Sequence, residues 1–79
     1  MKTTDTLRAE FKTHRAEALR VMPRWLFDQE SQHEVMEISD GEDITPEMWV
    51  SAAYRVASDA VAIVAKARKY AAKYGTRAV

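Results

Sequence analysis

Apolar residues recur every three or four positions through the second half of the chain, which is the spacing of one face of a helix. No Gly or Pro lies between Pro46 and Gly75. Thr45, Pro46 and Glu47 have the order of an N-cap, a first-turn proline and a first-turn acid, and Gly75 has the position of a glycine that ends a helix. The pattern therefore predicts one continuous helix over residues 46–74, about 43 Å long.

The apolar stripe of this predicted helix follows the 4,3 spacing of a packed coiled-coil seam. A folded chain of this size is about 30 Å across, so the helix would extend beyond the rest of the molecule and expose part of the stripe. The simplest way to cover it is a homodimer in which two long helices pack about a two-fold axis. The predicted dimer seam consists of Trp49, Ala53, Val56, Ala60, Ile63, Ala67, Tyr70 and Tyr74.

A second, shorter helix is predicted over residues 5–22. Thr3, Thr4 and Asp5 are candidate caps at its start, and Pro23 ends or kinks it. Its apolar positions recur at helical spacing. They are Leu7, Phe11, His14, Ala18 and Val21 or Met22.

The predicted fold is therefore all-α, with two main antiparallel helices over about 5–22 and 46–74. Residues 1–79 form a single small domain, with a flexible C-terminal end at 75–79. Five large side chains are expected in the core or in the dimer seam, because a small domain needs them there. They are Trp25, Leu26, Phe27, Trp49 and Tyr54.

The secondary structure of the connection between the two helices, residues 28–47, is open from the sequence. Gln, Glu and Met favour helix over residues 31–44. Residues 33–39 also fit one short strand, ended by the turn signal of Asp40 and Gly41. A short helix or irregular structure and a single strand are thus the two alternatives, and a strand would have to pair with another chain.

Charge is segregated along a chain whose formal net charge is zero. Residues 28–47 contain eight of the twelve acidic residues and no Lys or Arg, whereas residues 66–79 contain basic residues and no acid. The first group forms an acidic band: Asp28, Glu30, Glu34, Glu37, Asp40, Glu42, Asp43 and Glu47. The basic group consists of Lys66, Arg68, Lys69, Lys73 and Arg77.

Several functional classes lack their characteristic residues. The absence of Cys excludes disulfides, thiolate metal sites and Cys nucleophiles. There is no glycine-rich phosphate loop and no recognisable nucleophile–base pair, so we do not expect an enzyme. His14 is expected to be partly buried rather than catalytic. His33 lies among acids, but neither it nor the acidic turn at Asp40 matches a known metal-binding spacing, so no metal and no cofactor are expected.

The chain shows no pattern of a membrane protein. Residues 2–17 mix basic and acidic residues without an apolar run, which is unlike a signal peptide. The longest apolar run, residues 60–65, is far shorter than the roughly 20 residues that a membrane span needs. We therefore expect a cytoplasmic protein without membrane contact.

Two functional hypotheses follow from these patterns. The first is a small non-enzymatic protein-binding module that regulates or inhibits a larger partner protein through its acidic segment and helical surface. Its expected partner-binding residues are Glu34, Glu37, Asp40, Glu42 and Asp43.

The alternative is a nucleic-acid-binding dimer that uses the basic end of the long helix. Its candidate contacts are Lys66, Lys69, Lys73 and Arg77. The acidic band has a third interpretation, in which it neutralises the basic end of its own chain or of a second copy.

Overall fold

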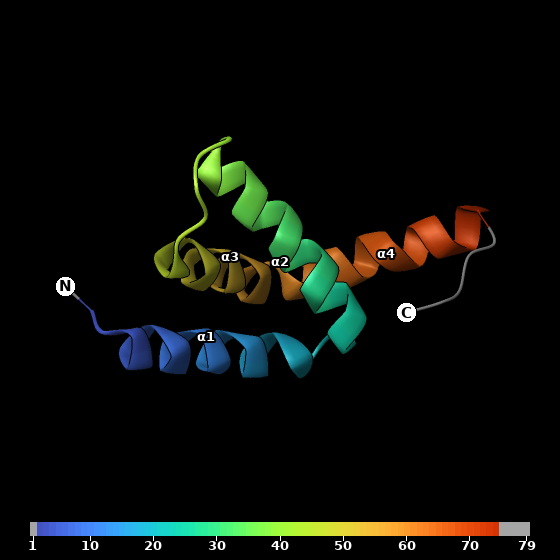
Figure 1. Ribbon diagram of the computed structural model, residues 1–79. Coiled ribbons are helices and arrows are strands. Elements are labelled where there is room, and N and C mark those ends of the chain that lie inside the picture. Colours follow the sequence, from blue (N-terminus) through green and yellow to red (C-terminus); the bar gives the residue numbers. More distant parts are fainter. Residues whose placement is uncertain (1, 75–79) are drawn as a thin grey trace.

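The computed structural model describes residues 2–74 of the chain, and this range folds into four helices (Figure 1). The all-α prediction is confirmed, but the expectation of two main helices is wrong. The helices are α1 (Thr4–Leu19), α2 (Arg24–Ser39), α3 (Pro46–Ser58) and α4 (Ala60–Tyr74). The C-terminal end at 75–79, which was predicted to be flexible, lies outside the described residues.

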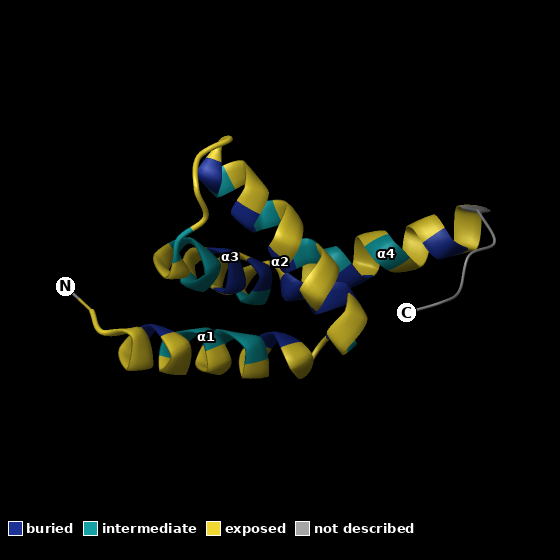
Figure 2. Ribbon diagram, viewed as in Figure 1, coloured by how far each residue is buried: buried dark blue, intermediate teal, exposed yellow. Residues whose placement is uncertain are grey.

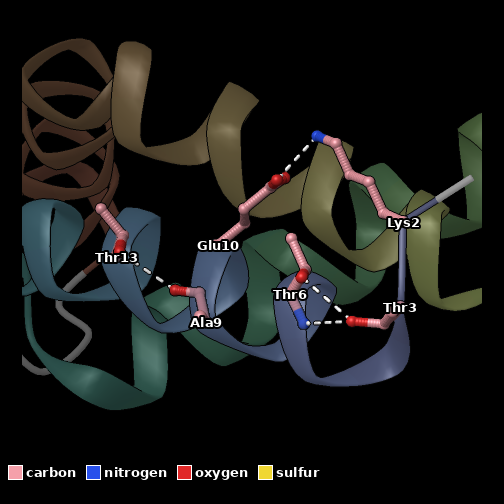
Figure 3. Close-up of polar contacts among 6 residues, drawn as sticks. All are labelled: Lys2, Thr3, Thr6, Ala9, Glu10 and Thr13. Atoms are coloured by element: carbon pink, nitrogen blue, oxygen red, sulfur yellow. Dashed lines mark hydrogen bonds and ion pairs between the residues drawn. The ribbon is translucent and has the colours of Figure 1, made fainter.

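Side-chain caps set the starts of α1 and α3. The Thr3 hydroxyl accepts a hydrogen bond from the Thr6 backbone N–H at 3.2 Å, as Figure 3 shows. Thr45 does the same for the Met48 N–H at 3.4 Å, directly before the proline at the first position of α3. Each cap satisfies one of the N–H groups that a helix start leaves without a partner. The start of α3 therefore agrees with the residue predicted from the sequence.

Residues 20–23 turn the chain between α1 and α2. The N–H groups of Val21 and Met22 both donate to the Ala18 carbonyl at 3.0 Å, and Pro23 then precedes the first residue of α2. Because a proline lacks the N–H that a helix interior needs, the chain stops and restarts here. The first helix is accordingly three residues shorter at its end than the range 5–22 predicted.

The connection between the first and second halves of the chain is mainly a 16-residue helix, α2, and contains no strand. The helix ends where Asp40 and Gly41 adopt positive φ angles of 48° and 85°. A left-handed residue is a common helix end, and Gly adopts this conformation without steric cost. Of the two sequence-based alternatives, the helix is correct and is longer than expected.

The predicted continuous helix 46–74 is wrong, because it is bent by 71° between α3 and α4. Asp59 lies at the bend with φ −103° and ψ 12°, outside the helical region, although neither Gly nor Pro is nearby. Beyond the bend, Ala60 and Val64 pack into the core with Met22 and Leu26. A straight helix would carry these side chains away from that contact. Their burial offsets the backbone hydrogen bonds that a helix restart gives up.

Helix α3 lies between α1 and α2 and forms the centre of the fold. Figure 1 shows that α1 and α3 run in the same direction, whereas α2 crosses back between them in sequence. Contacts along the pair agree, since the first turns of α1 and α3 line one groove and His14, farther along α1, meets Tyr54, farther along α3. The antiparallel pairing expected for the first helix and residues 46–74 is thus not found, because a full helix separates them in the chain.

The core lies where α1, α2 and the junction of α3 and α4 meet, and Figure 2 colours the buried parts of these helices dark blue. Phe27 is its largest fully buried side chain, and its ring makes an edge-to-face contact with the Phe11 ring at a centroid distance of 6.0 Å. Helix α4 extends from this core to one side, so the molecule measures 45 × 28 × 16 Å. The buried members of the core are Ala18, Met22, Leu26, Phe27, Ala53, Val56, Ala60 and Val64.

Two valines on successive helices provide a matched test of this core. Val56 is 1% exposed and Val61 is 72% exposed. We expect Val56→Ala to lower the free energy of unfolding by about 2 kcal/mol, because it removes buried apolar volume. Val61→Ala should change it by less than about 0.5 kcal/mol. Urea unfolding of dilute protein, followed by circular dichroism, measures both, and equal losses would contradict the fold.

Candidate interaction surface

Most of the acidic band lies on α2 and on the loop that follows it. Glu37 and Asp40 are exposed at the end of α2, and Glu42 and Asp43 are exposed in the loop. Of the band's eight acids, only Glu34 has an ion-pair partner within the described residues. The remaining seven carry negative charge that the described part of the chain does not pair.

Glu34 differs from the other predicted partner-binding acids. Its Oε2 lies 3.3 Å from a guanidinium nitrogen of Arg55, and this contact joins α2 to α3. The side chains of Glu34 and Arg55 are 31% and 56% exposed, so solvent screens the pair and its contribution to stability is small. Glu34 is therefore directed toward α3. The other predicted partner-binding acids form the exposed acidic surface, which consists of Glu37, Asp40, Glu42 and Asp43.

Large apolar side chains accompany these acids on the solvent side of α2. Trp25 and Met36 are 52% and 64% exposed, although Trp25 was expected in the core or the dimer seam. With Gln29 and Gln32 they follow the spacing i, i+4, i+7, i+11, which places all four on one face of the helix. We call these four residues the α2 outer face. Trp and Met are enriched at the centres of protein interfaces.

The exposure of Trp25 follows from the direction of the buried side of α2. Leu26 and Phe27 are buried with Ser31 and Val35, so the residue before them turns to solvent. The buried serine hides this pattern in the sequence, since Ser31 satisfies its hydroxyl by donating to the Phe27 carbonyl at 2.7 Å. A helical reading of positions 27, 31 and 35 would have identified the exposed side.

The predicted dimer seam is divided between the core and the surface. Ala53, Val56 and Ala60 are buried within the single chain, and Ile63 and Ala67 are partly buried against the same core. Trp49 is half-buried, and Tyr70 is 58% exposed. The side chain of Tyr74 lies outside the described residues. Because much of this stripe already packs inside one chain, the seam does not form a continuous free face.

The basic residues lie on the part of α4 that extends from the core. Lys66, Lys69 and Lys73 are exposed, and their i, i+3, i+7 spacing places them on one side of the helix. Arg68 is exposed on another side. Within the described residues, Lys66, Arg68 and Lys69 have no ion-pair partner. Arg77, the fourth candidate nucleic-acid contact, lies outside that range.

An apolar groove separates the first turns of α1 and α3. Its volume is about 320 Å³, near the lower end for small-molecule sites, and it is widely open to solvent. Its walls carry almost no polar surface, so it lacks the placed polar groups that fix a ligand's orientation. Its lining consists of Thr4, Leu7, Arg8, Phe11, Pro46, Trp49 and Val50.

Neither histidine has surroundings typical of a catalytic group. His14 is half-buried, with its ring against the edge of Tyr54 at a centroid distance of 5.3 Å and Nδ1 4.0 Å from a Glu17 carboxylate oxygen. His33 is exposed on α2. Among residues 2–74, no three His, Asp or Glu side chains gather closely enough to hold a metal ion.

Comparison with known proteins does not add a function. No family model, curated protein or solved structure matches the chain. None of the helices in the described range is by itself long and apolar enough to cross a membrane, and only the bent pair α3 and α4 reaches the necessary length and composition together.

Two adjacent residues on α2 test whether the α2 outer face contributes to the stability of the fold. We expect Trp25→Ala to change the free energy of unfolding by less than about 1 kcal/mol, because half of the side chain is already in water. Leu26→Ala removes a side chain that is 3% exposed and should cost about 2–5 kcal/mol. Urea unfolding monitored by circular dichroism compares the two. A larger loss for Trp25→Ala would show that this side chain belongs to the core.

Proposed function

We propose that this chain is a small non-enzymatic protein-binding module that docks on a basic surface of a larger protein and thereby regulates or inhibits it. The observation that carries the proposal is the α2 outer face, where Trp25 and Met36 are exposed beside acids that lack ion-pair partners in the described residues. Apolar anchors surrounded by charge are typical of interfaces in which a few residues supply most of the affinity.

The acids and the anchors have different roles in this mechanism. Exposed carboxylates such as Glu37, Asp40 and Asp43 attract a positively charged surface and raise the rate of encounter. Trp25 and Met36 then lose water against apolar side chains of the partner, which slows dissociation. A bound module of this kind acts by covering the partner's surface, so it needs no catalytic group.

Charge reversal on the acidic surface tests this function. A tagged wild-type chain is used for quantitative capture from a lysate, and each captured protein is purified and its affinity measured. Replacement of Glu37, Asp40, Glu42 and Asp43 by Lys should weaken a specific complex by at least about tenfold, because attraction becomes repulsion. Glu34 is kept, since it pairs with Arg55.

The matched control places four reversals of the same kind on acids outside the acidic band, at Asp5, Glu10 and Glu17 of α1 and at Asp59 between α3 and α4. The control should keep the affinity of the wild type within about threefold once its folding is verified by circular dichroism. Equal binding by the wild type and the fourfold lysine variant would contradict a role of the acidic surface. If none of the purified proteins binds the chain with micromolar affinity or better, this result would contradict the proposed function as a whole.

A second candidate function, nucleic-acid binding, is favoured by one observation. Lys66 and Lys69 are exposed on the same side of α4, which extends from the core, and they lack ion-pair partners in the described range. Cations on one surface can neutralise phosphate groups and release their bound counterions. The acidic band opposes such binding unless it faces away from the nucleic acid.

Salt dependence distinguishes the nucleic-acid hypothesis. If the chain binds DNA or RNA through α4, its affinity for a 20-nucleotide duplex or single strand should fall steeply between 50 and 200 mM salt, as counterion release requires. The double variant Lys66→Glu/Lys69→Glu should abolish binding. Fluorescence anisotropy measures both effects, and the absence of binding at 50 mM salt would reject this function.

A further inference from the structure

Two helices of this chain carry exposed faces whose residues have the same spacing and whose nearby charges have opposite sign. The α2 outer face consists of Trp25, Gln29, Gln32 and Met36. On α4, the residues at the same spacing i, i+4, i+7, i+11 are all exposed, and we call them the α4 outer face. They are Val61, Ala65, Arg68 and Ala72.

The two faces match in length and in the size of their side chains. Helices α2 and α4 have 16 and 15 residues, and each face spans eleven residue steps, about 16 Å. The α2 outer face has large side chains at its two ends. The α4 outer face has Ala65 between Val61 and Arg68 and ends at Ala72, and small residues allow another helix to approach closely. Val61, at 72% exposure, adds apolar area that water now covers.

The charges beside these faces are also complementary. Asp28 and Glu37 are exposed at the sides of the α2 outer face, whereas Arg68 and Lys69 are exposed on and beside the α4 outer face. None of these four side chains has an ion-pair partner in the described residues. The formal charge of the chain is zero, so two copies can approach without net repulsion while their opposite surfaces attract.

A single chain cannot join these two faces to each other. Ala60 and Val64 of α4 pack on the buried side of α2, near Leu26 and Phe27. Figure 1 shows α4 leaving this junction in a direction away from α2. Phe27, two positions after Trp25, lies on the opposite side of the helix from the α2 outer face. Contact between the two outer faces therefore requires a second copy.

We infer that the α2 outer face binds the α4 outer face of a second copy, and that a two-fold axis makes this contact twice in a homodimer. This inference rests on the proposed function, because it assigns a second copy of the chain as one of the partners whose basic surface the acidic surface binds. It also replaces the predicted seam: the dimer uses the solvent side of α4 rather than the stripe that is buried in the core. Dimerisation covers the surface that a larger basic protein would bind, so the two complexes compete.

Exchange of charges between the two faces tests the contact. One variant carries Asp28→Lys and Glu37→Lys on α2, and a second carries Arg68→Glu and Lys69→Glu on α4. Sedimentation equilibrium is measured for the wild type at low and high salt and for each variant alone. We expect a wild-type dimer that weakens as salt rises, and at least a tenfold weaker dimer for either variant, since like charges then meet at both contacts.

Mixing the two variants is the decisive measurement. In the mixed dimer, the reversed α2 meets the reversed α4, and the unchanged α4 meets the unchanged α2, so both contacts regain opposite charges. The mixture should associate with an affinity within about threefold of the wild type, which a misfolded variant could not do. A control with Arg8→Glu and Lys12→Glu on α1 changes the net charge by the same amount as the α4 variant and should dimerise like the wild type.

Three results would overturn the inference: a wild type that stays monomeric up to 0.5 mM, variants that dimerise as well as the wild type, or a mixture that does not recover. A lysine-rich amphipathic helical peptide separates this failure from that of the proposed function, with the fluorescence anisotropy of the labelled peptide as the readout. If a monomeric wild type binds the peptide and the α2 variant does not, the acidic surface functions but its partner is not a second copy. If neither binds, both proposals fail.

Discussion

Close packing of α3 between α1 and α2 is the contact on which the other features depend. Ala52 and Ala53 are completely buried on α3, and their small side chains let both neighbouring helices approach its backbone. Phe27 belongs to the same buried cluster as Ala53 and makes an edge-type ring contact with Phe11 on α1. A larger residue at either alanine would move a neighbouring helix outward and tilt the faces that it presents to solvent.

The local features of the fold could be predicted from the sequence, and the long-range ones could not. Thr45 and Pro46 begin α3, and Pro23 separates α1 from α2, because caps and prolines act on their own turn of the chain. The bend at Asp59 has no such local cause. It depends on the contact of Val64 with residues about forty positions earlier, and a helical pattern contains no information about that contact.

The candidate site was predictable in charge but not in shape. The acidic band and the basic end are visible in the sequence, and most of the predicted acids are indeed exposed. Glu34 differs from the other predicted acids because it pairs with Arg55, and this pairing was not visible in the sequence because Arg55 lies on a different helix. The exposed Trp25 and Met36 could not be recognised without knowing that the connection is a helix and that Ser31 faces inward. Binding-surface shape therefore depends on the same packing that set the bend.

The attachment of α4 near its first turns has a consequence for the cooperativity of folding. Helix α4 shares few contacts with α3 and joins the core through its first half, where Ala60 and Val64 are buried and Ile63 and Ala67 pack against them. An isolated helix of 15 residues is marginal in water. The far turns of α4 can therefore lose their helical structure while α1, α2 and α3 stay folded, and their backbone amides should exchange with solvent through such local opening rather than through global unfolding. Any molecule that holds α4 in its helical form, including another copy of the chain, must supply the free energy of this ordering.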